Sequence, residues 1–222
     1  MTGFIPLQKS SKSFENVVFF GADGGCLDAF YLASEIYSIT NKVILTDKKL
    51  EIPFDSVLGG GFENINEYIG SYFVFQCGNV NNHQSRHKWY LNATNVGAKP
   101  LTCISPYSYV HSTAKIGIGS IIYPGAKIMT NVKIGQNVIV LPNVVINHDC
   151  DIGDFSIINS SSVLNGGIKC GKNVFLGSNV IVKENCAISD YCTLGAGSLV
   201  LKDITQQGLY FGSPVKRRAD VL

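Results

Sequence analysis

The sequence predicts two parts in one chain: an α/β, Rossmann-like domain with a small parallel sheet, followed by an all-β left-handed parallel β-helix of hexapeptide repeats. Three observations lead to this fold class. An aliphatic residue recurs at every sixth position over about a hundred residues, alternating strand and helix patterns precede that repeat, and the chain contains 23 Gly but only 15% charged residues. Low charge with many glycines favours tightly turning β structure over helical bundles.

The six-residue repeat defines the second part. From Ile104 to Val200 every sixth residue is Ile, Val, Leu or Cys, without an insertion. This period fits neither an α-helix nor a plain strand, whereas it fits coils in which each hexad forms one side of a triangular prism. Residues 104–205 give between five and six coils of three hexads. At roughly 4.8 Å between coils the prism is about 25–30 Å tall.

Glycine and cysteine have regular places in this repeat. A glycine follows several of the aliphatic positions, where we expect a turn that needs permissive backbone angles: Gly117, Gly135, Gly153, Gly171, Gly177 and Gly195. Four of the seven cysteines occupy inward positions as small hydrophobic residues: Cys150, Cys170, Cys186 and Cys192. With an odd number of cysteines and no CxxC pair, the sequence predicts reduced thiols and no catalytic cysteine.

Charge and hydrophobicity exclude several classes of protein. The formal net charge is +2 and no basic run is present, which argues against a nucleic-acid binder or a polybasic membrane anchor. No apolar stretch is long enough for a membrane span, and the first fifteen residues lack the apolar core of a signal peptide. We expect a soluble, cytoplasmic protein.

The segment before the repeat has a β-α-β pattern. Its expected strands are 17–20, 43–45 and 73–76, and its expected helices are 27–39 and 81–95. The predicted organisation is a tail (1–15), a Rossmann-like domain (16–103), the β-helix (104–205) and a C-terminal extension (206–222). In a parallel sheet the carboxyl ends of the strands share one edge, where ligands bind and where a helix start favours phosphate.

The glycine turn at residues 21–25 is a weak signal for a ligand. Asp23 takes the place of the second glycine of G-x-G-x-x-G, and an acidic residue there disfavours dinucleotide binding. A tight strand-to-helix turn without any ligand is the alternative interpretation.

Of the four histidines, His148 is the catalytic candidate because Asp149 follows it directly. In a bent corner that carboxylate can reach the imidazole, fix its tautomer and make the other ring nitrogen a better base. One coil later, Gly166 and Gly167 leave a slot beside the pair, with backbone N–H groups that could face an oxyanion. The alternative interpretation of His148 and Asp149 is a surface pair without a catalytic role. We expect the other three histidines, His83, His87 and His111, to be solvated surface residues. With so few histidines in the prism we expect no metal site.

These motifs resemble the bacterial nucleotide-sugar and sialic-acid acetyltransferases, especially the N-acetyltransferases of UDP-4-amino-4,6-dideoxy sugars in bacillosamine-type pathways. The resemblance covers nearly everything after the first fifteen residues. It rests on the glycine turn, Thr46-Asp47, Gly78-Asn79, Arg86, the run from Asn147 to Asp154 and the closing residues 211–216. The chain departs from that pattern at three places: Gly25-Cys26 replaces His-Gly, Thr46 replaces the first Asp of a pair, and Ile157 replaces a histidine found in some members.

The resemblance implies a function and a set of site residues. His148 would be the general base and Asp149 its partner, with acetyl-CoA as co-substrate and a nucleotide-linked amino sugar as acceptor, in a homotrimer. The substrate-binding residues would be Asp23, Gly24, Gly25, Thr46, Asp47, Gly78 and Asn79. The acetyl-CoA-binding residues would be Ile157, Gly166, Gly167, Ser178 and Ala196. Two alternatives stay open: an O-acetyltransferase of sialic acid or another surface-polysaccharide sugar, and a non-catalytic β-helix scaffold.

Overall fold

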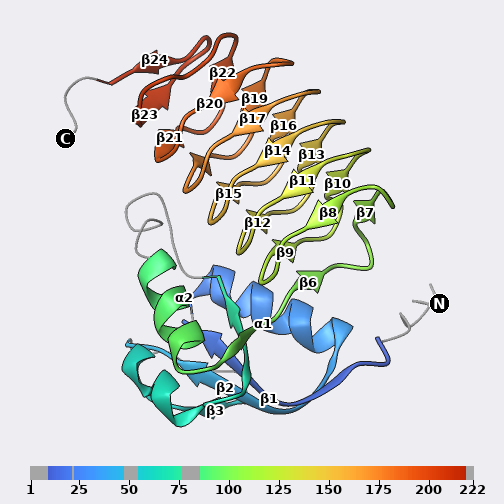
Figure 1. Cartoon of the computed structure of the whole chain (residues 1–222), viewed down its shortest axis with the longest axis vertical. Helices are drawn as coiled ribbons and strands as arrows, with labels where there is room; N and C mark the ends of the chain where they lie inside the picture. The colour runs from blue at the N-terminus through green and yellow to red at the C-terminus, as the bar shows by residue number, and fades with distance from the viewer. Residues whose placement is uncertain (1–9, 22, 48–54, 77–85, 219–222) are drawn as a thin grey trace.

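The protein is described by a computed structural model that covers residues 10–21, 23–47, 55–76 and 86–218. An α/β domain forms one end, and a stack of coils rises from it to the C-terminal strands (Figure 1). The sequence predictions for Cys77, Gly78, Asn79 and residues 81–85, including His83, lie outside the described residues. No helix in the described ranges is long and apolar enough to cross a membrane.

The α/β domain contains a parallel sheet of order β3-β2-β1-β4-β5. Its strands are β1 (Ser13–Phe20), β2 (Ser38–Leu45), β3 (Val57–Leu58), β4 (Tyr72–Phe75) and β5 (Lys99–Pro100), and its helices are α1 (Gly24–Ile36), η1 (Phe62–Glu67) and α2 (Arg86–Asn95). Phe20 pairs with both Leu45 and Phe75, so the three central strands end together at one edge. The predicted parallel sheet is therefore confirmed, although α1 begins three residues earlier than the expected helix.

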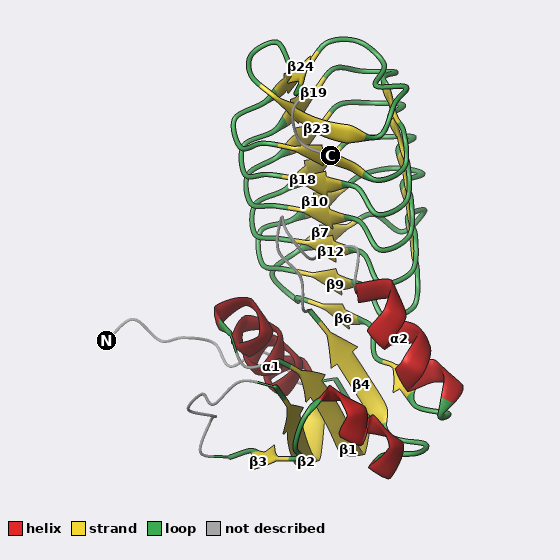
Figure 2. Ribbon diagram, turned by 90° about the vertical axis from the view of Figure 1, so that its left-hand side faces the viewer, coloured by secondary structure: helices red, strands yellow, loops and turns green. Residues whose placement is uncertain are grey.

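The prism has three faces of short parallel strands (Figure 2). The first face consists of β6 (Cys103–Ile104), β9 (Ile121–Ile122), β12 (Ile139–Val140), β15 (Ile157–Ile158), β18 (Phe175–Leu176), β21 (Cys192–Leu194) and β23 (Gly208–Phe211), with β24 (Lys216–Arg217) antiparallel to β23. The second face consists of β7 (Tyr109–Val110), β10 (Lys127–Ile128), β13 (Val145–Ile146), β16 (Val163–Leu164), β19 (Ile181–Val182) and β22 (Leu199–Val200). The third face consists of β8 (Lys115–Ile116), β11 (Lys133–Ile134), β14 (Asp151–Ile152), β17 (Lys169–Cys170) and β20 (Ala187–Ile188).

Three corners join these faces. We call the bend between the first and second faces the first corner (for example 141–144), that between the second and third faces the second corner (147–150), and that between the third and first faces the third corner (153–156). From β6 to β22 each strand pairs with the strand eighteen residues later, as in Ile139 with Ile157 and Val145 with Val163, whereas β21 pairs with β23 at a spacing of sixteen residues. The hexapeptide β-helix predicted from the repeat is thus confirmed.

The inward positions of the repeat form the prism core. Ile122, Ile128, Val140, Ile146 and Leu164 are fully buried in one cluster. The inward cysteines are also buried, as predicted, and none of them forms a disulfide with another described residue: Cys150, Cys170, Cys186 and Cys192. Buried serines add polar links between coils, since Ser162 accepts from Val180 N at 3.2 Å and donates to Gly177 O at 3.0 Å.

The expected role of the repeat glycines was wrong. Positive φ values instead fall two residues later, as in Asn131 (59°), Asn137 (48°) and Asn143 (61°), because Asn tolerates the left-handed region. Gly117 and Gly153 have ordinary backbone angles, but an added Cβ would lie 2.3 Å and 2.5 Å from the next coil's backbone. Close stacking of coils therefore requires these glycines.

The α/β domain is anchored to the prism at two places. Helix α1 packs between the sheet and the first face, where Phe30, Ala33, Ile121, Ile139 and Ile157 share one core. At the third corner Arg86 of α2 is 1% exposed and donates to Phe155 O at 2.9 Å and Asn137 O at 2.8 Å. These contacts hold the edge of the sheet against the first face.

Candidate active site

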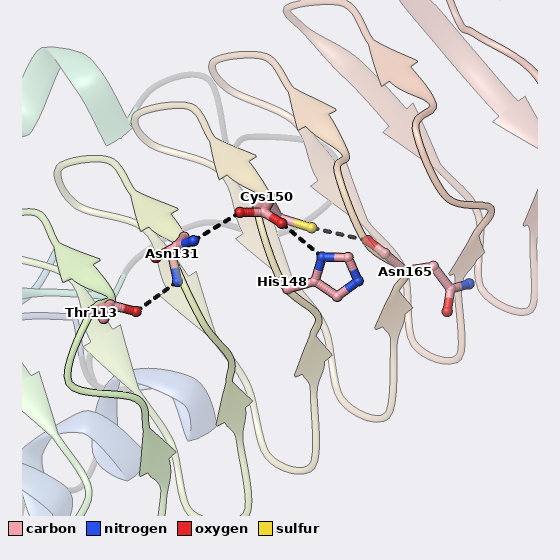
Figure 3. A network of polar contacts seen from close by, with 6 residues as sticks. Thr113, Asn131, His148, Cys150 and Asn165 are labelled. Atoms are coloured by element: carbon pink, nitrogen blue, oxygen red, sulfur yellow. Dashed lines mark hydrogen bonds and ion pairs between the residues drawn. The ribbon is translucent and has the colours of Figure 1, made fainter.

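His148 and Asp149 form a hydrogen-bonded pair at the second corner (Figure 3). Asp149 Oδ2 lies 2.8 Å from His148 Nδ1, and both side chains are exposed. Asp149 has a φ of 59°, which is the bend that turns its carboxylate back to the preceding ring. Because a carboxylate only accepts, Nδ1 carries the proton in this contact and Nε2 presents its lone pair outward.

Asp149 is held by the coil below as well. Asn131 Nδ2 donates to Asp149 Oδ1 at 3.0 Å, and Asn131 N donates to Thr113 Oγ1 at 2.8 Å. The hydrogen bonds from His148 and Asn131 lower the pKa of Asp149 from its usual range. The carboxylate is therefore ionised at neutral pH and fixed in orientation.

The space beside Gly166, which the sequence predicts as a slot for a ligand, is occupied by the His148 ring itself. An added Cβ at Gly166 would lie 2.5 Å from His148 Cε1 and 2.6 Å from Nε2. The prediction that both glycines offer free N–H groups was wrong for Gly167, whose N–H donates to His148 O at 2.9 Å as part of the coil stacking. Of these two glycines, only Gly166 has an N–H group that remains a candidate oxyanion donor.

Cys150 belongs to the core rather than to the chemistry of this corner. Its Sγ donates to Asn165 O at 3.0 Å, and burial raises the pKa of the thiol. A protonated, buried thiol is a poor nucleophile.

The predicted substrate-binding residues that the structure describes lie at the carboxyl edge of the sheet. Asp23 caps α1 by accepting from Cys26 N at 3.2 Å, and Gly24 and Gly25 form the first turn of that helix. Thr46 is buried at the end of β2, and Asp47 Oδ1 accepts from Phe62 N at 3.1 Å. Asp23 and Asp47 therefore each have a structural role in their own turns.

A cavity of about 430 Å³ opens between this edge and the prism. Asp23, Gly25, Asp28 and Gln76 line it from the α/β domain. The first face and first corner contribute the remaining walls: Ile139, Leu141, Pro142, Ile157, Asn159, Ser160 and Phe175. Its volume is that of a small-molecule site.

Comparison with known proteins identifies the architecture. Residues 131–166 match the family model of the bacterial transferase hexapeptide (six repeats). The acetyltransferase domain of PglB from Neisseria gonorrhoeae FA1090, in complex with acetyl coenzyme A, is 23% identical, with a TM-score of 0.83 over 92% of this chain and 100% of that chain. This chain has the hexapeptide-repeat acetyltransferase fold.

Two further structures share this hexapeptide-repeat acetyltransferase fold. PerB from Caulobacter crescentus, in complex with CoA and GDP-perosamine, is 23% identical, with a TM-score of 0.80 over 92% of this chain and 97% of that chain. WeeI from Acinetobacter baumannii AYE is 18% identical, with a TM-score of 0.77 over 93% of this chain and 100% of that chain. A search of curated proteins gives no match.

Within the hexapeptide-repeat acetyltransferase fold, the predicted acetyl-CoA-binding residues divide between two corners. Ser178 and Ala196 follow one another along the first corner, and Ile157 lies on the first face beside Asp23 and Gly25 in the cavity. Gly166 and Gly167 lie at the second corner with His148. The two groups flank the second face from opposite edges of one prism.

Four residues around these sites did not emerge from the sequence. Thr113 and Asn131 could have been found by stepping back from Asp149 in coils of eighteen residues. Asp28 lies one helical turn after Gly25, and Gln76 is a polar residue at the end of an apolar strand. In the described part of the chain, no group of three or more His, Cys, Asp or Glu side chains could hold a metal ion.

Proposed function

We propose that the protein is an acetyl-CoA-dependent N-acetyltransferase acting on the amino group of a nucleotide-linked 4-amino-4,6-dideoxy sugar in surface-glycan biosynthesis. The observation that carries the proposal is the oriented His148–Asp149 pair, whose imidazole packs against Gly166. The donor is supported by two similar structures, the PglB acetyltransferase domain in complex with acetyl coenzyme A and PerB in complex with CoA. The acceptor class is supported by the GDP-perosamine in the PerB structure.

His148 Nε2 would act as the general base. As the sugar amine attacks the thioester carbonyl carbon, His148 removes the proton from nitrogen, and Asp149 stabilises the resulting imidazolium. The tetrahedral oxyanion, placed near the Gly166 N–H, collapses with cleavage of the C–S bond, and the imidazolium returns the proton to the leaving thiolate. General-base assistance of this kind contributes about 10²–10⁴-fold to the rate.

The complete site would be built from two subunits. The cavity lies at the first corner and His148 at the second, so one chain separates them by the width of the second face. That face carries a stack of apolar side chains formed by Val145, Val163, Ile181 and Leu199, of which Ile181 is 45% exposed. A homotrimer would cover this stack and bring His148 of one subunit toward the cavity of its neighbour.

CoA-thiol release from acetyl-CoA tests the proposal. The acceptors are a panel of UDP-, dTDP- and GDP-linked 4-amino-4,6-dideoxy sugars and CMP-sialic acid, with mass spectrometry of each product. We expect turnover on an amino sugar that falls at least about 10²-fold in His148→Ala. His87→Ala is the control, since His87 is an exposed histidine on α2, outside the network that orients Asp149.

Other outcomes would contradict the proposal in distinct ways. Release with hydroxyl acceptors alone would replace it with O-acetylation. CoA binding without release from any acceptor would favour a scaffold. Full activity in His148→Ala would remove the general-base assignment.

A further inference from the structure

The cavity at the start of α1 is lined by a largely buried side chain whose amide nitrogen is accessible and makes no hydrogen bond to the described residues. Gln76 follows β4, is 8% exposed and lines the cavity. Its Oε1 accepts a hydrogen bond from Tyr123 Oη, while its Nε2 makes no hydrogen bond within the described parts of the chain. Buried amide N–H groups are normally satisfied by protein, water or ligand, so this group points to an acceptor atom in the cavity.

Tyr123 determines which end of the Gln76 amide faces the cavity. Tyr123 is 4% exposed on the first face, and burial raises the pKa of its phenol, which therefore stays a donor. Because Tyr123 donates to the amide oxygen Oε1, the NH₂ group of Gln76 lies on the other side of the amide, toward α1. The position of Gly25 agrees, because an added Cβ there would lie 3.2 Å from Gln76 Nε2.

Asp28 supplies the complementary acceptor. It lies one helical turn after Gly25 on the same face of α1, and its carboxylate makes no hydrogen bond or ion pair to the described residues. Asp23 and Asp28 are the charged side chains that line the cavity. Two carboxylates disfavour a phosphate here, whereas a hydroxyl group can accept from Gln76 and donate to Asp28.

We propose that Gln76, oriented by Tyr123, and Asp28 together bind a hydroxyl of the acceptor's sugar ring, so that the sugar occupies this cavity and the diphosphate lies outside it. The apolar walls at Ile139, Ile157 and Phe175 suit the C–H face of a pyranose. Because Gly25 has no side chain, the amide of Gln76 fits beside the first turn of α1. This inference rests on the proposed function for the identity of the acceptor.

Kinetics of a Gln76→Leu variant, which removes the donors but keeps the bulk, provide the first test. We expect the KM for the amino-sugar acceptor to rise about tenfold while the KM for acetyl-CoA is unchanged. Tyr123→Phe, which keeps Gln76 but frees its amide, should shift the acceptor KM in the same direction. Gln136→Leu, at the third corner, is the control, and thermal unfolding of each variant establishes that it is folded.

A deoxy acceptor separates recognition from structure. The wild-type protein should lose about tenfold in kcat/KM when the recognised hydroxyl is removed from the sugar, whereas Gln76→Leu should lose nothing further. Equal acceptor KM values in folded Gln76→Leu and wild-type protein would overturn the inference. So would equal sensitivity of both proteins to every deoxy sugar.

Calorimetric binding distinguishes failure of this inference from failure of the proposed function. The nucleotide-linked sugar should bind more tightly than the free nucleoside diphosphate, and Gln76→Leu should abolish that difference. If this holds without acetyl transfer, the proposed reaction is wrong and the sugar site stands. If transfer occurs but the binding difference is absent or independent of Gln76, the reaction stands and the sugar site is wrong.

Discussion

Replacing Gly166 with alanine would displace His148, the proposed general base, without disturbing the fold. The added Cβ would lie 2.5 Å from His148 Cε1, so the ring must move by about 1 Å to reach ordinary van der Waals contact. That movement breaks the 2.8 Å contact between His148 Nδ1 and Asp149 Oδ2. Because a misplacement of about 1 Å can cost about 10²-fold, we expect kcat to fall by that factor.

The same substitution should leave stability almost unchanged. Gly166 is outside the left-handed region, and the His148 side chain is 67% exposed and can move into solvent. We expect a melting temperature within about 3 °C of wild type. Gly167→Ala is the contrasting variant, because its φ of 71° gives a strain of about 1–2 kcal/mol.

Steady-state kinetics of Gly166→Ala, His148→Ala and the double variant test this reasoning. The effect of Gly166→Ala should vanish once His148 is absent, since the alanine acts through the ring. Wild-type kcat in folded Gly166→Ala would refute the geometry. An equal further loss in the His148→Ala background would show that Gly166 acts by another route.

Three further predictions concern the domain contact, the pair and the assembly. Arg86→Met should lower the free energy of unfolding by about 3 kcal/mol in urea titrations, because it removes two hydrogen bonds from a buried cation, and a wild-type midpoint would contradict this. We expect ¹³C NMR to give Asp149 a pKa below its ordinary value of 3.8, so the His148–Asp149 pair persists above this lowered pKa and is lost as the pH falls through it. An unchanged pKa of Asp149 in His148→Ala would contradict the assigned cause. Ile181→Asp should convert the trimer to monomers in light scattering and abolish transfer, with exposed Lys115→Asp on the third face as control.

The prism could be predicted almost completely because its repeat encodes both register and burial. Each aliphatic position is inward, and up to Val200 each stacked pair is eighteen residues apart, as in Ile128 with Ile146. The glycines were harder, because a sequence does not distinguish a glycine needed for φ from one needed for close approach, such as Gly117. The early part of β2 was missed because Thr40, Asn41 and Lys42 carry no apolar pattern.

The contact between His148 and Asp149 was predictable because the residues around it are neighbours either in sequence or by one coil. Asp149 follows His148 directly, and Gly166 lies eighteen residues later. The cavity could not be predicted from the sequence, because it depends on how α1 docks on the first face. No spacing connects Gln76 with Tyr123, and their contact exists only once that docking is known.

Because the rise per coil is uniform, the number of coils sets the distance between two points along the prism. His148 and the β23–β24 hairpin are held apart by stacked coils, each adding about 4.8 Å. Inserting or deleting one coil beyond Asn185 would therefore change that separation in fixed steps while leaving the corner that carries His148 intact. The length of an extended ligand lying along the prism could in this way be matched by coil number alone.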